Sequence, residues 1–268
     1  MSDGSMKISL VTLSFNQREY LAEAIDSVLS QEYQETEYIV VDPGSNDGSR
    51  QLIESYGTKI AHLIFQPDRG AAEGLNNGFA VATGDVFGFL NADDILFPSS
   101  LNQVSGFFKA HSECDIVMGN GYTIDSLGRT IKHYKARDFS VRRFFYGGSE
   151  WLQQATFFKA DLYRRAGGFN PENRTSWDGE LLLKMASLGA KIGYLNADIG
   201  AFRIHDKSIS GSGRLNKQYQ QDCRRIFREL NGRDWKRRDE FLRLLFRTEG
   251  ILKRIGRRTK RSQQKCAA

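Results

Sequence analysis

The chain has 268 residues, a formal net charge of +6, 40% hydrophobic and 26% charged residues, and a mean hydropathy of −0.47. This length and balance exclude a disordered or fibrous protein and allow one large core. No apolar run approaches the roughly 18 residues that cross a bilayer, and the N-terminus lacks an apolar secretory segment, so we expect a cytoplasmic protein. Cys114, Cys223 and Cys266 are widely spaced, which argues against a disulfide framework and a thiolate zinc site.

The positive charge belongs to the C-terminal part of the chain. Residues 1–213 carry 20 Lys and Arg against 26 Asp and Glu, a net charge of −6, whereas residues 214–268 carry 18 against 6, a net charge of +12. A segment this basic is typical of a surface that meets phosphate groups, or of a solvated face.

Apolar runs alternate with amphipathic stretches over the first hundred residues. We expect strands at 7–13, 38–42, 60–65 and 85–91, with helices near 21–29, 49–56 and 72–82. This order predicts an α/β fold with a mostly parallel sheet covered by helices on both faces. Ligands of such sheets bind beyond the carboxyl ends of the strands. The polar strand exits at 12–16, 42–47, 66–70 and 91–94 are therefore the expected site.

The pattern is looser beyond residue 98. It predicts helices near 98–110, 139–146 and 181–188, strands at 115–118 and 191–195, and a hairpin over 121–133. We interpret this part as an α+β half that packs on the first. The stretch SISGSGR, from Ser208, combines Ser and Gly without apolar period and marks the best domain boundary.

Asp93 and Asp94 directly follow the strand at 85–91, and no basic residue lies within eight positions on either side. Two carboxylates at one strand end repel each other unless a cation lies beside them, so a divalent metal is one interpretation. The alternative is that one of them caps the following helix.

Two further strand exits carry charged candidates. Asp42 ends the second strand before Pro43, and its carboxylate can accept from a nucleobase N–H or a ribose hydroxyl, or can form an ordinary Asx-turn. Arg69 at the third exit is either a cation for an anionic ligand or a surface residue.

The second half offers a carboxylate and an imidazole. Asp178 begins the helix near 181–188, where it either favours the positive end of the helix dipole or acts as a general base. His205 precedes the Ser/Gly boundary and is either a metal ligand, a phosphate donor or neither. No Walker-type loop and no Gly-x-Gly-x-x-Gly follow the first strand, which disfavours P-loop and dinucleotide redox chemistry.

Taken together, these segments resemble the family-2 glycosyltransferases, nucleotide-sugar enzymes of the GT-A fold. The matching stretches run in order through most of residues 6–210: LVTLSFNQREYLAEAIDSVLSQEY (10–33), EYIVVDPGSNDGS (37–49), PDRGAAEGLNNGFAVATGDVFGFLNADD (67–94), WLQQATFFKADLYRRAGGF (151–169), WDGELLLKMASLG (177–189) and FRIHDKSIS (202–210).

The resemblance implies roles for several matching positions. Asp42 and the main chain around Thr12 would contact the nucleotide base. From its place at the third strand exit, we also expect Arg69 in the nucleotide site. Asp93 would lie near the ribose. Asp94 would bind the metal, Mn²⁺ or Mg²⁺, with His205 near the metal and diphosphate. Asp178 would be the catalytic base.

The implied protein has a GT-A domain at 6–210, divided into a nucleotide-binding half at 6–97 and an acceptor half at 98–210, and a basic amphipathic helical extension at 211–268. We expect a metal-dependent, inverting transferase that moves a sugar from a nucleotide-diphosphate donor, with UDP favoured, to a hydroxyl of a glycan or lipid-linked acceptor in cell-surface polysaccharide biosynthesis. The alternatives are a nucleotidyltransferase and a non-catalytic membrane-surface or scaffold protein with the same fold.

The extension itself predicts a partner. Residues 235–261 combine a helical apolar stripe with a dense run of Lys and Arg. Such a helix either lies on an anionic membrane, which would make the protein peripheral on the inner face, or packs its stripe on the catalytic domain. Nucleic acid is not expected, because aromatic residues are not interleaved with the basic ones.

Overall fold

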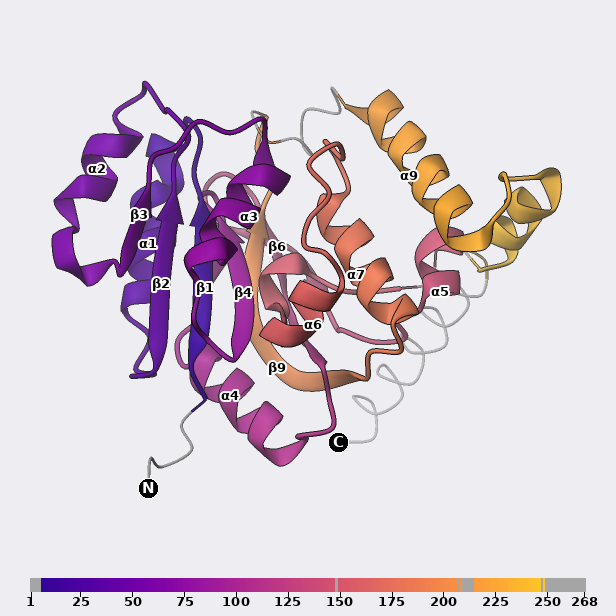
Figure 1. The fold of residues 1–268 in the computed structure, drawn as a ribbon, viewed down its shortest axis with the longest axis horizontal. Coiled ribbons are helices and arrows are strands. Elements are labelled where there is room, and N and C mark those ends of the chain that lie inside the picture. Colours follow the sequence, from indigo (N-terminus) through magenta and orange to yellow (C-terminus); the bar gives the residue numbers. More distant parts are fainter. Residues whose placement is uncertain (1–5, 148, 207, 209–214, 247, 249–268) are drawn as a thin grey trace, which may run out of the picture.

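The computed structural model describes residues 6–147, 149–206, 208, 215–246 and 248. Its strands form one twisted sheet with helices packed on both faces (Figure 1). The α/β class predicted from the alternation of strands and helices is confirmed.

The first hundred residues form the predicted β-α-β succession. Its elements are β1 (Ile8–Leu13), α1 (Arg18–Leu29), β2 (Thr36–Val41), α2 (Ser49–Ser55), β3 (His62–Ile64), α3 (Ala71–Val81), β4 (Val86–Asn91), the short β5 (Ile95–Leu96) and α4 (Ser100–Ala110). β1, β2 and β4 are buried nearly throughout, as continuous apolar runs predict for strands with helices on both sides.

The later residues add the elements that complete the sheet. They are β6 (Ile116–Ile124), β7 (Thr130–Tyr134), α5 (Val141–Tyr146), the 3-10 turn η2 (Gln153–Ala155), β8 (Thr156–Lys159), α6 (Ala160–Arg165), α7 (Trp177–Ser187), β9 (Ile192–Arg203) and α9 (Asn216–Asn231). The sequence pattern did not predict β5, β8 or α6, each of which is six residues or shorter.

The strand order is β3-β2-β1-β4-β8-β6-β9-β5, with β7 paired to β6. Parallel pairing runs through β3, β2, β1 and β4 and returns between β6 and β9. The pairs through β8, β5 and β7 are antiparallel. The carboxyl ends of β1, β2 and β4 therefore meet at one edge, where the sequence predicts the site.

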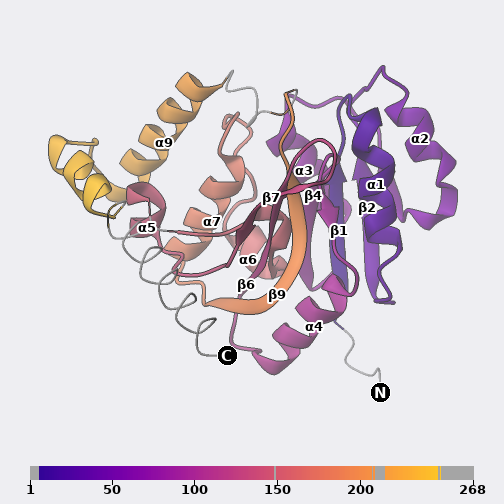
Figure 2. The same ribbon diagram turned by 180° about the vertical axis from the view of Figure 1, so that it is seen from behind.

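Helices on the two faces bury separate apolar clusters. On the face toward the viewer in Figure 1, α3, α6 and α7 cover the sheet with residues such as Phe79, Leu162 and Leu181. On the opposite face, shown in Figure 2, α1 and α4 contribute residues such as Ile25 and Phe108. Burial of both faces explains why the central strands lack polar alternation.

Two glycines face each other between strands β6 and β9. A Cβ atom added to Gly121 would lie 2.3 Å from the backbone oxygen of Gly200 and 2.9 Å from Leu152 Cδ1. A real Cβ cannot approach a carbonyl oxygen so closely, so only glycine fits at position 121 without shifting β9. This contact joins the central strand of the second half directly to the strand that ends at Arg203.

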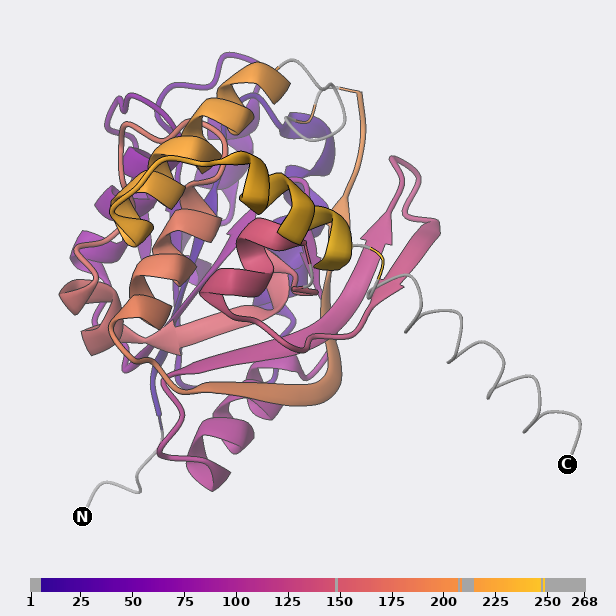
Figure 3. The same ribbon diagram turned by 90° about the vertical axis from the view of Figure 1, so that its right-hand side faces the viewer.

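α9 and residues 232–246 lie against α7 and α5 (Figures 1 and 3). Ile226 of α9 belongs to the same buried cluster as Leu181 of α7. Residues 237–246 are helical, and Tyr146 of α5 donates from its hydroxyl to Asp239 at 2.8 Å. None of the helices in the part of the chain that the structure describes is long and apolar enough to cross a membrane.

Candidate active site

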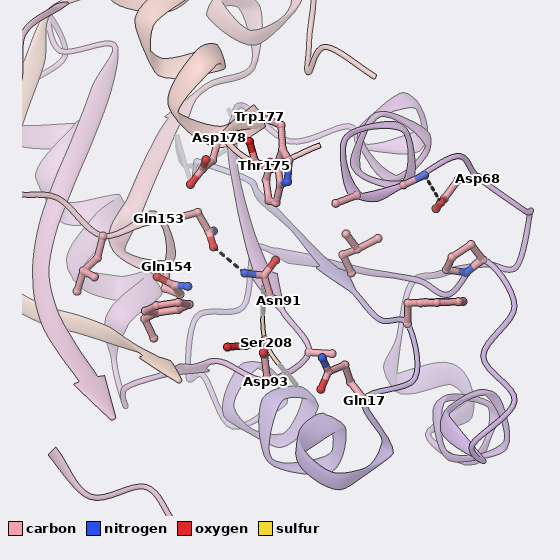
Figure 4. A pocket seen from close by; sticks show the side chains of 18 of the residues that line it. Gln17, Asp68, Asn91, Asp93, Gln153, Gln154, Thr175, Trp177, Asp178 and Ser208 are labelled. Carbon is pink, nitrogen blue, oxygen red and sulfur yellow. Dashed lines mark hydrogen bonds between the residues drawn. The ribbon is translucent and has the colours of Figure 1, made fainter. Parts of the chain in front are cut away.

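A cavity of about 680 Å³ opens at the carboxyl ends of β1 and β4. Strand-exit residues such as Leu13 and Asn91 form one side, and residues around η2 and the start of α7 form the other. Asp93 and Asp178 both line the cavity, and in the view of Figure 4 Asn91 and Gln153 lie between them. The cavity thus unites residues of the two predicted halves.

Asp93 lines the cavity and contacts an imidazole that does not itself line it. Its Oδ2 lies 3.0 Å from Nε2 of His205, and both side chains are almost completely buried. The ring of Tyr20 packs 4.9 Å from the His205 ring and holds its plane. The structure therefore brings together the carboxylate and the imidazole that the sequence singled out 112 positions apart.

Asp94 has different surroundings. It is fully buried, it does not line the cavity, and its carboxylate accepts from three N–H groups: the backbone of Arg203 and the side-chain amides of Asn91 and Gln154. Burial and the neighbouring charge of Asp93 raise the pKa of Asp94 well above its usual range, against the effect of these hydrogen bonds. Neither carboxylate caps α4, which begins after Ser99.

Arg203 fixes the loop that carries the two carboxylates. Its buried guanidinium donates to the Asp93 carbonyl at 2.8 Å and to Oε2 of Glu23 on α1 at 2.6 Å. The guanidinium also lies over the ring of Tyr20, 4.8 Å from its centroid. Arg203 was not predicted as a site residue, because nothing in the local sequence pattern marks it as the link between β9, α1 and this loop.

The carboxyl end of β2 carries a buried carboxylate, Asp42. Asp42 is fully buried, and its Oδ1 accepts from the backbone N–H groups of Gly44 and Ser45, as in the predicted Asx-turn. Its Oδ2 has no hydrogen-bond partner among the described residues. Asp42 itself does not line the cavity, but the next residue, Pro43, does.

Asp68 is a cavity residue that the sequence reasoning passed over. Its Oδ1 accepts from the backbone of Gly70 at 2.8 Å, and its Oδ2 is buried without a hydrogen-bond partner among the described residues. Burial, and then the charges of Glu73 and Asp42, raise the pKa of Asp68. The signal that could have found it is its position one residue before Arg69, at a strand exit.

The other two predicted nucleotide residues occupy contrasting positions. The Thr12 hydroxyl is buried and accepts from the Tyr38 hydroxyl at 2.9 Å, so it is the following residue, Leu13, that reaches the cavity. Arg69 lines the cavity, but its Nε is 3.0 Å from Oε2 of Glu73, one turn along α3. Its guanidinium is thus held at the rim.

Asp178 lies at the first turn of α7, on the side of the cavity that η2 and the start of α7 form. Its Oδ1 accepts from the Gly179 backbone at 2.7 Å. Burial raises the pKa of Asp178 to about 6, although backbone N–H groups act in the opposite direction. A carboxylate with a pKa near neutrality, open to a cavity, has the properties of a general base.

Several polar lining residues escaped the sequence reasoning. Gln153 donates to the backbone oxygen of Phe89 at 2.6 Å and accepts from Asn91 at 3.2 Å, so it bridges β4 and η2 below the cavity. Thr175 lines the cavity beside Asp178 (Figure 4). The adjacent amides of Gln153 and Gln154 within an otherwise apolar stretch were the available signal.

The described residues contain no cluster of three or more His, Cys, Asp or Glu side chains arranged to hold a metal ion. Asp93 at the cavity wall and His205, which lies next to it outside the lining, nevertheless offer one carboxylate oxygen and one imidazole nitrogen 3.0 Å apart. Both are ligand types that divalent cations such as Mn²⁺ accept. The remaining ligands of an ion at this point would have to come from a substrate or water.

Comparison with known proteins identifies the family. Residues 9–164, more than half of the chain, match the family model described as glycosyl transferase family 2. The chain belongs to this family. The family-2 resemblance deduced from the sequence stretches is therefore confirmed, and the cavity lies where the strands of the matched region end.

Relatives of family 2 extend the similarity beyond the matched region. An uncharacterized glycosyltransferase of Nostoc sp. is 33% identical over 214 residues, which is 75% of this chain and 65% of the relative. Glycosyltransferase GlyG of Streptococcus pneumoniae is 31% identical over 140 residues, 50% of this chain and 46% of the relative. The chain thus spans about two thirds or less of the length of these relatives.

Solved structures support the same fold. TarS 1–349 of S. aureus, in complex with UDP-GlcNAc, has a TM-score of 0.67 at 19% identity, covering 84% of this chain and 65% of that one. The mannosyltransferase PcManGT of Pyrobaculum calidifontis, in complex with GDP-Man and Mn²⁺, has a TM-score of 0.64 at 18% identity, covering 93% and 70%. These likenesses establish the GT-A fold expected from the sequence.

Proposed function

We propose that this family-2 member is a metal-dependent, inverting glycosyltransferase. It would move a sugar from a nucleotide-diphosphate donor to a hydroxyl of a glycan or lipid-linked acceptor in cell-surface polysaccharide biosynthesis. The observation that carries the proposal is the single cavity that exposes Asp93, beside His205, and a carboxylate of raised pKa, Asp178. Asp93 with His205 suits a cation that binds the diphosphate of a donor, and Asp178 suits the hydroxyl of an acceptor.

In the proposed reaction, Asp178 takes the proton of the acceptor hydroxyl while that oxygen attacks the anomeric carbon of the sugar. The bond between this carbon and the diphosphate oxygen breaks, and the nucleoside diphosphate leaves with the electron pair. A single displacement inverts the configuration at the anomeric carbon. It needs one base and no covalent intermediate, and the cavity offers one carboxylate on the acceptor side, Asp178.

The metal side of the proposal rests on Asp93 and His205 rather than on Asp94. Asp93 lines the cavity, whereas the oxygens of Asp94 already accept three N–H donors away from it. We therefore assign the metal contact to Asp93 with His205, and to Asp94 the task of holding the loop. Bound Mn²⁺ or Mg²⁺ would stabilise the negative charge of the leaving diphosphate.

For the donor, we propose a uridine diphosphate sugar. Oδ2 of Asp42 is a buried acceptor without a partner among the described residues, and uracil offers one N–H, at N3. Leu13 at the end of β1 and Pro43, which follows Asp42, add apolar side chains to the cavity wall. Two of the similar solved structures, both of TarS, hold a uridine nucleotide, UDP-GlcNAc in one and UDP in the other, whereas PcManGT holds GDP-Man.

Calorimetric titration tests this donor assignment. UDP, GDP and ADP are titrated into the purified chain, each in Mn²⁺ and each in EDTA. We expect UDP to bind in Mn²⁺ and to lose most of its affinity in EDTA, because the diphosphate and the acidic wall would otherwise repel each other. Binding of GDP alone would overturn the uridine assignment. No binding of any nucleotide in Mn²⁺ would overturn the proposed function.

We further propose that the helix at 237–246 rests on an anionic membrane. Phe241, Leu244 and Leu245 form an exposed apolar face, with exposed fractions of 61%, 60% and 46%. Arg237 and Arg238 on the same helix are also exposed, and Figure 3 shows the helix at the outside of the molecule beside α5. Apolar and basic residues on one exposed helix fit an anionic bilayer surface. The rest of the predicted membrane segment, residues 249–261, lies outside the described residues.

Sedimentation with lipid vesicles tests this second proposal. We expect the chain to sediment with vesicles of phosphatidylcholine and phosphatidylglycerol, and less so with phosphatidylcholine alone or at high salt. The double variant Phe241→Ala/Leu244→Ala should reduce sedimentation. The matched control is Leu127→Ala/Ile131→Ala, which removes exposed apolar side chains from the β6–β7 hairpin. Equal sedimentation of both variants, or none by the wild type, would contradict the proposal.

A further inference from the structure

The segment between α6 and α7 leads directly into the proposed catalytic base, and one of its side chains contacts a helix much later in the chain. Thr175 lines the cavity, and its hydroxyl donates to Oδ2 of Asp222 on α9 at 2.7 Å. Asp222 is only 4% exposed, although it is a charged residue on a largely polar helix. A buried carboxylate that accepts from a cavity residue is a specific constraint on that residue.

A second and stronger contact lies two residues beyond Asp178. Glu180 is 1% exposed, and the Arg225 guanidinium on α9 donates to both of its oxygens, at 2.6 and 3.3 Å. Asn170 and Asn173 donate to the same carboxylate at 2.9 and 2.7 Å. Although burial acts to raise it, hydrogen bonds from Arg225, Asn173 and Asn170 lower the pKa of Glu180 to about 2.

The two contacts hold both ends of one short stretch. Asn173, through its side-chain oxygen, accepts from the backbone N–H groups of Thr175 and Ser176, and its amide is in turn bound by Glu180. Residues 173–180 are therefore tied to themselves and, through Arg225 and Asp222, to α9. Figure 1 shows α9 lying beside α7 along this stretch.

We propose that α9 is part of the catalytic unit, and that Arg225 and Asp222 are positioning residues that hold Thr175 and Asp178 at the cavity wall. This inference rests on the proposed function, in which Asp178 is the base. It assigns a role to a helix that lies outside residues 9–164, the region that matches the family model. It also means that the predicted division at residue 210 separates the base from the groups that orient it.

Arg225→Ala tests the proposal, with Arg228→Ala as the matched control. Arg228 is on the same helix and pairs with Asp234 at the surface, so its loss removes a similar charge without touching residues 173–180. In Arg225→Ala we expect kcat to fall by about 100-fold with little change in donor KM, because a displaced base affects the chemical step more than donor binding. The pH dependence of kcat should also shift, which a general loss of stability would not cause.

A second readout does not depend on transfer activity. Backbone hydrogen exchange of residues 173–180 should be clearly faster in Arg225→Ala than in the wild type and in Arg228→Ala, without any donor present. If Arg225→Ala does not fold, Asp222→Asn tests the other contact, since the amide keeps the shape but loses the charge that Thr175 contacts. Wild-type exchange in the folded variant overturns the proposal. If exchange is accelerated in Arg225→Ala but the wild type itself shows no transfer activity, the result counts against the proposed function alone.

Discussion

Replacement of Asp178 by Asn should lower transfer by about 10²- to 10⁴-fold while nucleotide binding stays near the wild-type value. The amide keeps the size and the position of the side chain but cannot take the proton of an acceptor hydroxyl. Asp178 lines the acceptor side of the cavity, so its loss should leave the donor contacts of the opposite wall in place. Steady-state transfer assays and calorimetric titration of UDP in Mn²⁺ measure the two effects.

The same carboxyl predicts a pH dependence. Because the pKa of Asp178 is raised to about 6, the base is mostly protonated below that pH, and transfer should rise as pH passes through about 6. Tyr219 and Cys223 of α9 are close enough to interact with the charge of Asp178. Burial raises the pKa of each, so neither side chain loses its proton near pH 6. A transfer rate independent of pH between 5 and 7, or a fully active Asp178→Asn variant, would contradict the assignment of Asp178 as the base, whereas a wild type without transfer would favour the non-catalytic scaffold.

Asp93→Asn should remove most of the metal dependence of donor binding. Loss of even an outer partner of a metal ligand typically costs about 10- to 100-fold in metal affinity, so loss of the carboxylate itself should cost at least that. We expect UDP to bind this variant equally weakly in Mn²⁺ and in EDTA. The neighbouring Arg203 contact to the Asp93 carbonyl is unaffected by the substitution, which should preserve the loop.

Asp94→Asn provides the contrast. Three N–H groups donate to this buried carboxylate, and an amide nitrogen in place of one oxygen would face at least one of them. We expect a loss of stability of about 1–3 kcal/mol, seen as a lower melting temperature, rather than a specific loss of the metal effect. If Asp94→Asn abolished Mn²⁺-dependent binding at an unchanged melting temperature, while Asp93→Asn bound normally, the assignment of the two carboxylates would have to be reversed.

The contrast between these neighbours shows where sequence reasoning reached its limit. The strand exits were predictable because buried parallel strands are continuous apolar runs, and β1, β2 and β4 lie within two residues of their expected bounds. The directions in which the Asp93 and Asp94 carboxylates point could not be predicted, because a turn closed by a hydrogen bond from the Asp94 N–H to the Asn91 carbonyl follows β4. Within such a turn the alternation of a strand no longer tells which side chain faces the cavity.

Other parts of the site depend on contacts that no local pattern records. His205 meets Asp93 across 112 positions, and Arg203 reaches Glu23 across 180. The second half was harder to predict because β8 has four residues and pairs antiparallel with both neighbours, so it lacks the length and the helix spacing that identified the first strands. Gln153 and Gln154 precede it and were overlooked for the same reason.

The unbroken hydrogen bonding from β1 through β4, β8 and β6 to β9 limits how the molecule can move. The strands that carry the two halves of the cavity belong to one sheet, and β6 and β9 touch where Gly121 faces Gly200. Hinge bending between the halves would require breaking the hydrogen bonds between these strands, at a large cost in free energy. Because the two halves share one sheet, we expect loops at the rim of the cavity, rather than rigid-body closure of the halves, to control access to it.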